Sequence, residues 1–413
     1  MMQSGLNSTI GDVTTVVTKG TTPTTMGRSF TSSGIGFIKA ECISDDGALI
    51  KEKQVFIDEE TDHLLKRSRL QRDDVLFSIA GVIGRTALVQ EAILPANTNQ
   101  AIAILRPKGE VIDPRFLYYT VRAKGFQDHS LGHVVQTAQA NVSLGVLSAA
   151  PIWLPSFPVQ RRIAGILSAY DGLMENSQRR IRLLEAMARA LYREWFVHFR
   201  FPGHEKHPRV ASALGDIPRG WEVKRVPDCV DISPRVAVPR DGEKPFVPMG
   251  CLSNDSMLIT DIESRSGNSG AKFQNGDTLF ARITPCLENG KTGFVQFLPE
   301  PQAVGFGSTE FIVLRSRTLT PEFVYLLARS DEFRGVAIKS MSGATGRQRV
   351  QEQCFDDFQI VQPPPALLDR FSAIVAQSFR LIYKLHLQIE NLRLTRDLLL
   401  PRLLSGQLEI GNN

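Results

Sequence analysis

Residues 366–400 read ALLDRFSAIVAQSFRLIYKLHLQIENLRLTRDLLL, and this stretch predicts one long helix. Its apolar side chains recur in alternating steps of three and four residues, which is the heptad pattern of a coiled-coil seam. Polar side chains interrupt the seam only at Ser378 and Arg396. A seam of about five heptads predicts a second helix of similar length as its partner. The predicted seam consists of Leu368, Phe371, Val375, Ser378, Ile382, Leu385, Ile389, Leu392, Arg396, Leu399 and Leu403.

A matching helix is predicted earlier in the chain, and it also begins after a proline-rich segment. Its seam has one stutter, at Ile181. The length of both seams favours a coiled coil between the two helices. The alternative is two amphipathic helices, each packed only on its own domain. The first seam consists of Ile163, Ile166, Tyr170, Leu173, Ser177, Ile181, Leu184, Ala188, Leu191 and Trp195.

The two helices belong to an internal repeat. Residues 73–77 (DDVLF) match 276–280 (GDTLF), and residues 84–86 (GRT) match 290–292 (GKT) 206 positions later. Two longer segments match 207 positions later, namely 112–119 (IDPRFLYY) with 319–326 (LTPEFVYL) and 151–158 (PIWLPSFP) with 358–365 (FQIVQPPP). Four ordered matches at nearly constant spacing indicate a duplicated chain, in which each globular unit is followed by a helix.

Each globular unit is predicted to be α+β. Short Val/Ile/Phe-rich runs separated by glycine-rich turns predict strands at 75–79, 101–105, 278–283 and 310–314. Segments 113–124 and 320–334 begin with Asp-Pro or Thr-Pro and predict helices. The predicted domains are a globular domain at 1–157, a spacer helix at 158–200, a second globular domain at 201–363, and a second spacer helix with the tail at 364–413.

Connectivity predicts the direction of the two helices. The second globular unit follows the first helix and precedes the second helix, so a compact unit would bring those two helix ends together. The helices would then run antiparallel, with the first unit at the opposite end and a pseudo-twofold relation between the halves.

Composition indicates a soluble protein of a reducing compartment. No apolar run approaches the roughly 18 residues of a membrane span, and the N-terminus lacks the pattern of a signal peptide. The five cysteines include no CxxC pair, so neither a disulfide framework nor a zinc site is expected, and a cytoplasmic location is predicted. The net charge of +5 is concentrated in 160–200 and 366–410. A partner with negative charge would therefore be met by local patches.

Three motifs that resemble catalytic or metal sites are incomplete. Residues 289–292 (NGKT) resemble the end of a phosphate-binding P-loop, but Pro285 stands where the loop requires an earlier glycine. Glu222-Val223-Lys224 with Asp216 resembles a metal-dependent nuclease site, although six residues is a short separation for two carboxylates on neighbouring strands. The histidines show no HExxH motif, and only His198, His204 and His207 cluster, in the connector after the first helix.

The sequence also lacks the motifs of methyl transfer. It contains no Asn-Pro-Pro-aromatic motif, which amino-methyltransferases need to hold a flipped base, and no glycine-rich cofactor motif after a strand. We therefore predict that this chain has no catalytic activity of its own.

Several segments resemble the specificity subunits of type I restriction–modification systems. Residues 157–163 (FPVQRRI) and their counterpart at 364–371 are similar to the two conserved regions of that family. Residues 214–223 (LGDIPRGWEV) resemble the lead-in to its second target-recognition domain, and 400–406 (LPRLLSG) resemble its usual ending. Residues 19–23 (KGTTP) are similar to a polar loop near the start of such a domain. The second junction is less typical, because it has Leu368 where the first has Gln160.

The resemblance implies a function as well as a fold. Two target-recognition domains would each read one half of an asymmetric, bipartite site in double-stranded DNA, and the antiparallel coiled coil would set the distance between them. Two copies of a modification (methyltransferase) subunit would dock on the coiled coil and its flanks. That subunit brings S-adenosylmethionine and flips an adenine. A separate restriction/translocase subunit would use ATP and Mg²⁺, and this chain itself would bind no cofactor or metal and no membrane.

Base reading requires Arg, Lys, Asn, Gln, Ser or Thr on loops that face a groove. For each candidate the alternative is a solvated loop residue. In the first unit the predicted DNA-binding residues are Lys19, Thr21, Thr22, Arg28, Arg85, Gln136, Gln139 and Asn141. In the second unit they are Arg235, Arg240, Lys291, Ser342, Thr345, Arg347, Gln348 and Arg349. Helix arginines that would meet phosphates or a partner subunit, or lie on a solvated face, are Arg161, Arg162, Arg179, Arg180 and Arg182.

Two other functions remain open at this point. One is a coiled-coil interaction scaffold without DNA specificity, and the other is a stand-alone nuclease built around Glu222 and Lys224. DNA binding and metal-dependent cutting by the purified chain distinguish the three.

Overall fold

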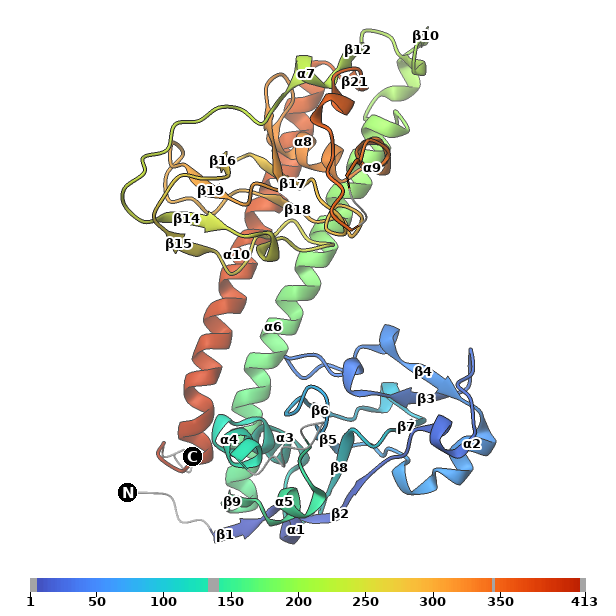
Figure 1. Cartoon of the computed structure of the whole chain (residues 1–413), viewed down its shortest axis with the longest axis vertical. Helices are drawn as coiled ribbons and strands as arrows, with labels where there is room; N and C mark the ends of the chain where they lie inside the picture. The colour runs from blue at the N-terminus through green and yellow to red at the C-terminus, as the bar shows by residue number, and fades with distance from the viewer. Residues whose placement is uncertain (1–5, 133–140, 344–345, 409–413) are drawn as a thin grey trace. The chain divides into compact units, whose positions relative to one another are not determined.

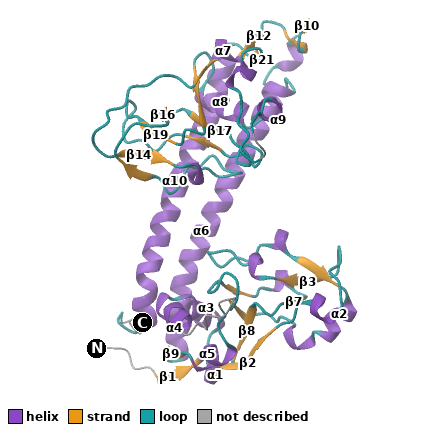
Figure 2. Ribbon diagram, in the orientation of Figure 1, coloured by secondary structure: helices purple, strands orange, loops and turns teal. Residues whose placement is uncertain are grey.

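The computed structural model describes residues 6–132, 141–343 and 346–408, and the chain divides into two compact units. Unit 1 comprises Met1–Met174 and Asn391–Asn413, and unit 2 comprises Glu175–Glu390. Both units combine helices with short strands (Figure 1, Figure 2), which confirms the α+β prediction.

Unit 1 contains a four-stranded sheet of order β2-β8-β5-β6, a three-stranded sheet of order β4-β3-β7, and the pair β1-β9. Strands β3 and β7 run parallel, and all other pairs in this unit are antiparallel. Its elements are β1 (Leu6–Thr9), α1 (Ile10–Val13), β2 (Thr14–Lys19), β3 (Ile35–Ile38), β4 (Val55–Ile57), α2 (Glu59–Leu64), β5 (Val75–Ser78), β6 (Thr86–Leu88), β7 (Ala96–Thr98), β8 (Ile102–Pro107), α3 (Pro114–Arg122), α4 (Lys124–Gly132), α5 (Leu144–Ala149) and β9 (Pro151–Leu154).

Unit 2 repeats this plan with sheets of order β13-β20-β17-β18 and β15-β14-β19-β16, the pair β12-β21 and an added hairpin β10-β11. Its parallel pair, β14 with β19, corresponds to β3 with β7. Its elements are β10 (Arg209–Ser212), β11 (Gly215–Pro218), β12 (Glu222–Arg225), α7 (Val226–Cys229), β13 (Val230–Ile232), β14 (Lys244–Val247), β15 (Glu263–Arg265), β16 (Ala271–Phe273), β17 (Thr278–Ala281), β18 (Thr292–Phe294), β19 (Gly305–Gly307), β20 (Phe311–Ser316), α8 (Pro321–Ala328), α9 (Asp331–Lys339) and β21 (Gln359–Gln362).

A buried ion pair marks the same point in both units. In unit 1 Arg106 donates to the fully buried Asp74 carboxylate over 2.7 and 2.8 Å. In unit 2 Arg315 donates to the buried Asp277 over 2.7 and 2.6 Å. Each aspartate also accepts a backbone N–H at 2.7 Å from the residue three positions before it. The predicted duplication is therefore confirmed down to individual hydrogen bonds.

Two helices, α6 (Phe157–Tyr192) and α10 (Pro365–Leu404), contribute to both units. Within unit 1 the start of α6 and the end of α10 share one hydrophobic core, with Ile163 and Leu403 in the same cluster. Arg396 of α10 donates to Asp171 of α6 over 2.6 Å. Within unit 2 the end of α6 meets the start of α10, where Trp195 and Phe371 have ring centroids 6.0 Å apart. The two helices are thus antiparallel within each unit.

Several predicted seam positions fall one residue before the buried side chain. In α6 the buried residues are Leu167, Met174, Glu185 and Tyr192, where Ile166, Leu173, Leu184 and Leu191 were predicted. In α10 they are Phe379 and Leu400, where Ser378 and Leu399 were predicted. Leu173 was predicted in the seam but is 51% exposed, whereas Met174 is buried. Buried side chains recur every seven residues through Leu167, Met174, Ile181 and onward, so no stutter occurs at Ile181. At this position the error came from assigning Leu173 to the seam in place of the neighbouring Met174.

Local polar contacts explain two further differences from the sequence predictions. Segment 320–334 is not one helix, because α8 ends at Ala328 and Ser330 caps a new helix by accepting the N–H of Phe333 at 3.2 Å. At the first junction Gln160 is buried and bonds to Asp113 N, Val111 O and Pro155 O. Leu368 is also buried, so the second junction has apolar packing in place of this polar network.

Among the described residues, no helix combines the length and the hydrophobicity that a membrane span requires.

Candidate nucleic-acid interface

The described ends of the two predicted polar runs, Asn141 and Arg349, occupy equivalent places. In unit 1 Asn141 forms a β-bridge with Ala80, and Val142 N donates to Ile79 O over 3.0 Å. In unit 2 Arg349 forms the matching bridge with Ile283, and Val350 N donates to Arg282 O over 2.8 Å. Asn141 and Arg349 therefore lie against the end of the central strand, β5 or β17. Predicted residues outside the described part of the chain are Gln136, Gln139 and Thr345.

The Thr-rich loop of unit 1 begins where β2 ends at Lys19. Thr22 donates from its N–H and its hydroxyl to Gln100 Oε1, over 3.0 and 2.5 Å. Gly20 passes so close to β7 that a Cβ there would lie 1.7 Å from Thr98 O, so no larger residue fits. Lys19, Thr21 and Thr22 are all partly exposed and accessible to a partner.

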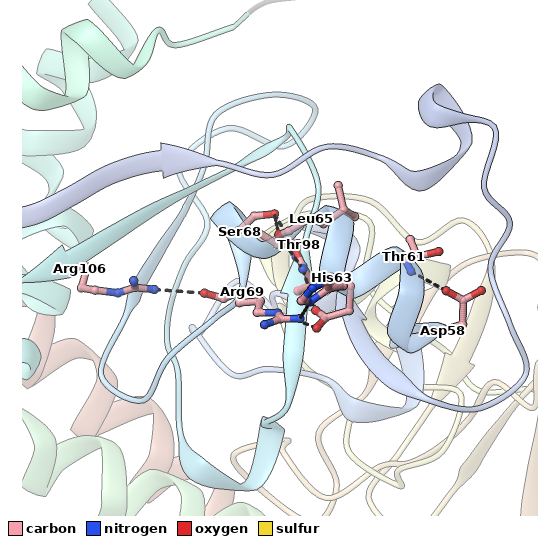
Figure 3. Close-up of polar contacts among 10 residues, drawn as sticks. Asp58, Thr61, His63, Leu65, Ser68, Arg69, Thr98 and Arg106 are labelled. Carbon is pink, nitrogen blue, oxygen red and sulfur yellow. Dashed lines mark hydrogen bonds and ion pairs between the residues drawn. The ribbon is translucent and has the colours of Figure 1, made fainter.

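A buried polar network lies next to this loop (Figure 3). Asn97 is fully buried and donates to Asp62 Oδ1 at 3.0 Å and to Leu65 O at 3.1 Å. Its own Oδ1 accepts from the Ser68 hydroxyl at 2.6 Å. Arg69 donates to the other Asp62 oxygen over 2.7 Å. The sequence alone did not single out these residues, because their contacts join segments about 30 positions apart.

The network reaches the loop through the backbone. Arg67, within the same short segment as Ser68, donates to Lys19 O over 3.4 Å. Thr98 follows Asn97 at the end of β7 and donates from its hydroxyl to Ile38 O at 2.8 Å. Because every member of a buried network needs its partners, this arrangement fixes β7, which Gly20 closely approaches.

Two predicted arginines of unit 1 are held by carboxylates. Arg28 forms a two-point ion pair with Glu60, whose hydrogen bonds raise the pKa of the Arg28 guanidinium. Arg85 donates to Asp45 Oδ1 over 2.8 Å and is 24% exposed at its side chain. Either guanidinium must leave its carboxylate, or share it, to contact DNA.

The predicted residues of unit 2 fall into exposed and occupied side chains. Arg235 and Arg240 are exposed on the loop that follows β13. Lys291, in contrast, donates from Nζ to Met249 O over 3.0 Å and is only partly exposed. Lys291 therefore helps to hold the 249–251 turn.

The two ends of the predicted run in unit 2, Ser342 and Arg349, are bonded to each other. Ser342 and Arg349 exchange backbone hydrogen bonds of 3.1 and 2.9 Å, and Arg347 lies exposed between them in sequence. Gln348 is anchored through its backbone to Thr284 by two bonds of 3.1 Å. This geometry presents the Arg347 side chain to solvent on an anchored backbone.

Arg349 forms a two-point ion pair with Glu310. Its Nε lies 2.9 Å from Oε2 and its Nη2 lies 2.6 Å from Oε1. These bonds lower the pKa of the Glu310 carboxyl and raise that of the guanidinium. The Arg349 side chain is nevertheless 52% exposed, so one edge of it remains available.

The rim of each unit, meaning the residues around the end of its central strand (β5 or β17), can be compared position by position through the strand registers. In each unit the residue after the central strand donates its N–H across the sheet, Ile79 to Ala101 O and Arg282 to Glu310 O. By the registers of β2 with β8 and of β13 with β20, Gly20 of unit 1 and Arg235 of unit 2 occupy equivalent positions. The equivalent pairs are Gly20 and Arg235, Ile79 and Arg282, Ala101 and Glu310, Asn141 and Arg349, and Leu144 and Glu352. At these five positions the residues are uncharged in unit 1 and charged in unit 2.

The motifs that resembled catalytic sites have local structural roles. Glu222 and Lys224 pair with each other over 2.9 Å on β12, whereas Asp216 is exposed on β11 of a separate hairpin. Asn289 N and Lys291 N are bonded to carbonyls of the same turn, at 2.9 and 3.0 Å, and so are not free to bind a phosphate. Within the described ranges, no group of three or more His, Cys, Asp or Glu side chains is arranged to hold a metal ion.

Comparison with known proteins agrees with the fold. A family model described as the type I restriction modification DNA specificity domain matches residues 6–186. The type I restriction enzyme MjaIX specificity subunit of Methanocaldococcus jannaschii is 24% identical over 350 residues, covering 81% of this chain and 78% of that protein. The EcoEI specificity subunit of Escherichia coli is 32% identical over 156 residues, covering 36% of this chain and 26% of that protein.

A solved structure extends the likeness to the whole fold. The S subunit of the type I restriction–modification system from M. genitalium superposes with a TM-score of 0.59 at 12% identity, covering 99% of this chain and 97% of that one. The chain is therefore similar in sequence and in fold to type I restriction–modification specificity subunits.

Proposed function

We propose that this chain is the sequence-recognition subunit of a type I restriction–modification complex and reads a bipartite, asymmetric site in double-stranded DNA. One observation carries the proposal. The two units share one backbone frame, with the same pattern of backbone hydrogen bonds and bridges at the end of the central strand and the same buried Asp–Arg pair. They differ in charge at the five equivalent rim positions. Base contacts depend on the side chains at the rim, so two such rims would read two different half-sites.

The recognition domains would correspond to 1–157 and 201–363, and the spacer helices to 158–200 and 364–413. In this assignment the chain binds no cofactor and performs no chemistry. Two copies of a modification subunit would supply S-adenosylmethionine and the methyl transfer. A restriction/translocase subunit would supply ATP- and Mg²⁺-dependent cleavage. Specificity subunits are the named relatives, which supports this division of labour.

Exposed apolar side chains on the two long helices support the docking of modification subunits there. Met187 and Leu183 of α6 are 65% and 54% exposed, and Leu394 and Leu398 of α10 are 61% and 62% exposed. Large apolar side chains at spacings of four residues on a helix surface are typical of a protein–protein contact. Exposed Arg179, Arg180 and Arg182 precede Leu183 on α6 and would add polar contacts, as would exposed Arg161 near the start of that helix.

Replacing both Arg347 and Arg349 with alanine should weaken recognition of one half-site only. Arg347 is exposed on an anchored backbone, and Arg349 keeps one edge exposed. A lost base contact costs about 1–3 kcal/mol, which is roughly 5- to 150-fold in affinity. The measurement is the methylation rate of the assembled complex on duplexes with one base pair changed at a time in either half.

The matched control is a double alanine variant at Arg209 and Arg219, exposed arginines on the hairpin of unit 2. This control removes the same charge and should leave both half-sites unchanged. Equal loss at both half-sites in the Arg347/Arg349 variant, with a lowered unfolding midpoint, would instead indicate unfolding.

The nuclease and scaffold alternatives are tested with the purified chain. We expect no metal-dependent cutting of duplex DNA, and no change in DNA binding in Glu222→Ala, because Glu222 pairs with Lys224. Robust cleavage that Glu222→Ala abolishes would overturn the proposed function. Failure of the chain to bind DNA even with its modification subunit would favour a scaffold.

A further inference from the structure

Unit 2 contains a hollow of about 620 Å³ at the rim described above. Its polar lining consists of Ser233, Arg235, Lys272, Arg282, Thr309 and Glu352, which come from five separate segments of the unit. The remaining lining is aliphatic, apart from the backbone of Gly270 and the buried ring of Phe311. Three of the lining side chains are cations and one is an anion.

The single carboxylate in this hollow is already neutralised. Arg282 Nη1 lies 2.9 Å from Glu352 Oε1, and its Nη2 donates to Val350 O over 3.0 Å. The third donor of this side chain, Nε–H, is buried and has no hydrogen-bond partner in the structure. A buried N–H without a partner costs free energy, which a ligand with acceptor atoms would recover.

The other two cations have donors to spare. Lys272 Nζ donates to Gly270 O over 2.8 Å, which uses one of the three N–H bonds of an ammonium group. Arg235 is exposed, and among the described residues its side chain makes no hydrogen bond or ion pair. The hollow therefore presents excess donors and excess positive charge.

The equivalent place in unit 1 has a different lining. Gly20, the counterpart of Arg235, lies against the Thr98 backbone, and Ile79 stands in place of Arg282. Gln100, the counterpart of the lining residue Thr309, accepts two hydrogen bonds from Thr22. The arginines that line the hollow in unit 2 thus have uncharged counterparts in unit 1.

We propose that the hollow lined by Arg235, Lys272 and Arg282 binds a backbone phosphate of the DNA and so fixes the register of unit 2 on its half-site. This inference rests on the proposed function, because it takes DNA as the source of the phosphate. Phosphate oxygens are acceptors only, which matches a lining rich in donors. An extruded base would need exposed aromatic faces for stacking, whereas the one lining ring, Phe311, is only 3% exposed.

The test measures how the affinity of the full chain with its modification subunit depends on salt. The probe is a mixed-sequence DNA duplex, titrated between about 50 and 200 mM salt. Each lost phosphate contact reduces the slope of log K against log salt by about 0.9. Arg235→Ala and Lys272→Gln should each show this reduction, so that the affinity lost across the range shrinks by about 3.5-fold. Lys272→Arg keeps the charge and should restore the slope.

The matched control is Lys206→Ala, which removes an exposed lysine from the connector after α6. A slope change in the two hollow variants but not in Lys206→Ala supports the proposal. Wild-type slopes in Arg235→Ala and Lys272→Gln, with unfolding midpoints unchanged, would overturn it. Such a result would leave the proposed function standing, because the wild-type complex would still bind the duplex. If the wild-type complex did not bind the duplex, both the phosphate site and the proposed function would be overturned.

Discussion

Inserting four residues into each long helix should lengthen the unspecified spacer of the recognised site by one or two base pairs and abolish methylation of the original site. The insertions go between Met174 and Glu175 in α6 and between Glu390 and Asn391 in α10, which are the boundaries between the two units. Four residues add about 6 Å and turn the helix by about 400°, so the original face is nearly restored. About 6 Å corresponds to just under two base pairs at about 3.4 Å each.

Both half-site sequences should stay unchanged in this variant, because neither rim has been touched. A four-residue insertion is a stutter, which a coiled coil absorbs by local unwinding. The control is a two-residue insertion at the same two points, which turns the helix by about 200° and should abolish methylation altogether. The same spacer with altered bases would contradict a measuring role for the helices.

Replacing Asp277 with alanine should destabilise unit 2 by about 3–5 kcal/mol. The Asp277 side chain is 1% exposed and holds Arg315 by two short hydrogen bonds, so its loss leaves a largely buried guanidinium without a partner. The Asp74→Ala variant should have a comparable effect on unit 1, where Arg106 would be left alone. The free energy of unfolding is measured by denaturant titration, with tryptophan fluorescence and circular dichroism as probes.

A surface ion pair supplies the control for this measurement. Asp228 lies 3.3 Å from Arg225 and is 47% exposed at its side chain. Its replacement by alanine should cost no more than about 1 kcal/mol, because solvent screens an exposed pair. A cost for Asp277→Ala as small as that of Asp228→Ala would show that the repeated aspartate does not stabilise the frame.

The long helices and the duplication could be predicted from the sequence because both are periodic signals. A heptad seam depends on side chains close in sequence, so both long helices were predicted, although four seam positions of α6 were assigned one residue too early. The error at Leu173 arose because the neighbouring Met174 satisfies the seven-residue spacing equally well as an apolar residue. The break at Ser330 was missed because a capping serine also occurs inside helices.

The candidate interface could be predicted as regions but not as side chains. The polar runs were located through the repeat, yet their availability depends on carboxylates distant in sequence. Glu60 pairs with Arg28, Asp45 with Arg85 and Glu310 with Arg349, over separations of 32 to 40 residues. Lys272 and Arg282 were missed altogether, because only the fold brings them beside Arg235.

In the proposed function this chain alone decides which DNA sequence its complex modifies. The genome-wide map of adenine methylation in cells that express the modification subunit with and without this chain tests this directly. Methylation should occur at a single sequence made of two specified halves around an unspecified spacer, and only when the chain is expressed. Methylation of the same sequence without the chain, or of a continuous site with no spacer, would contradict it.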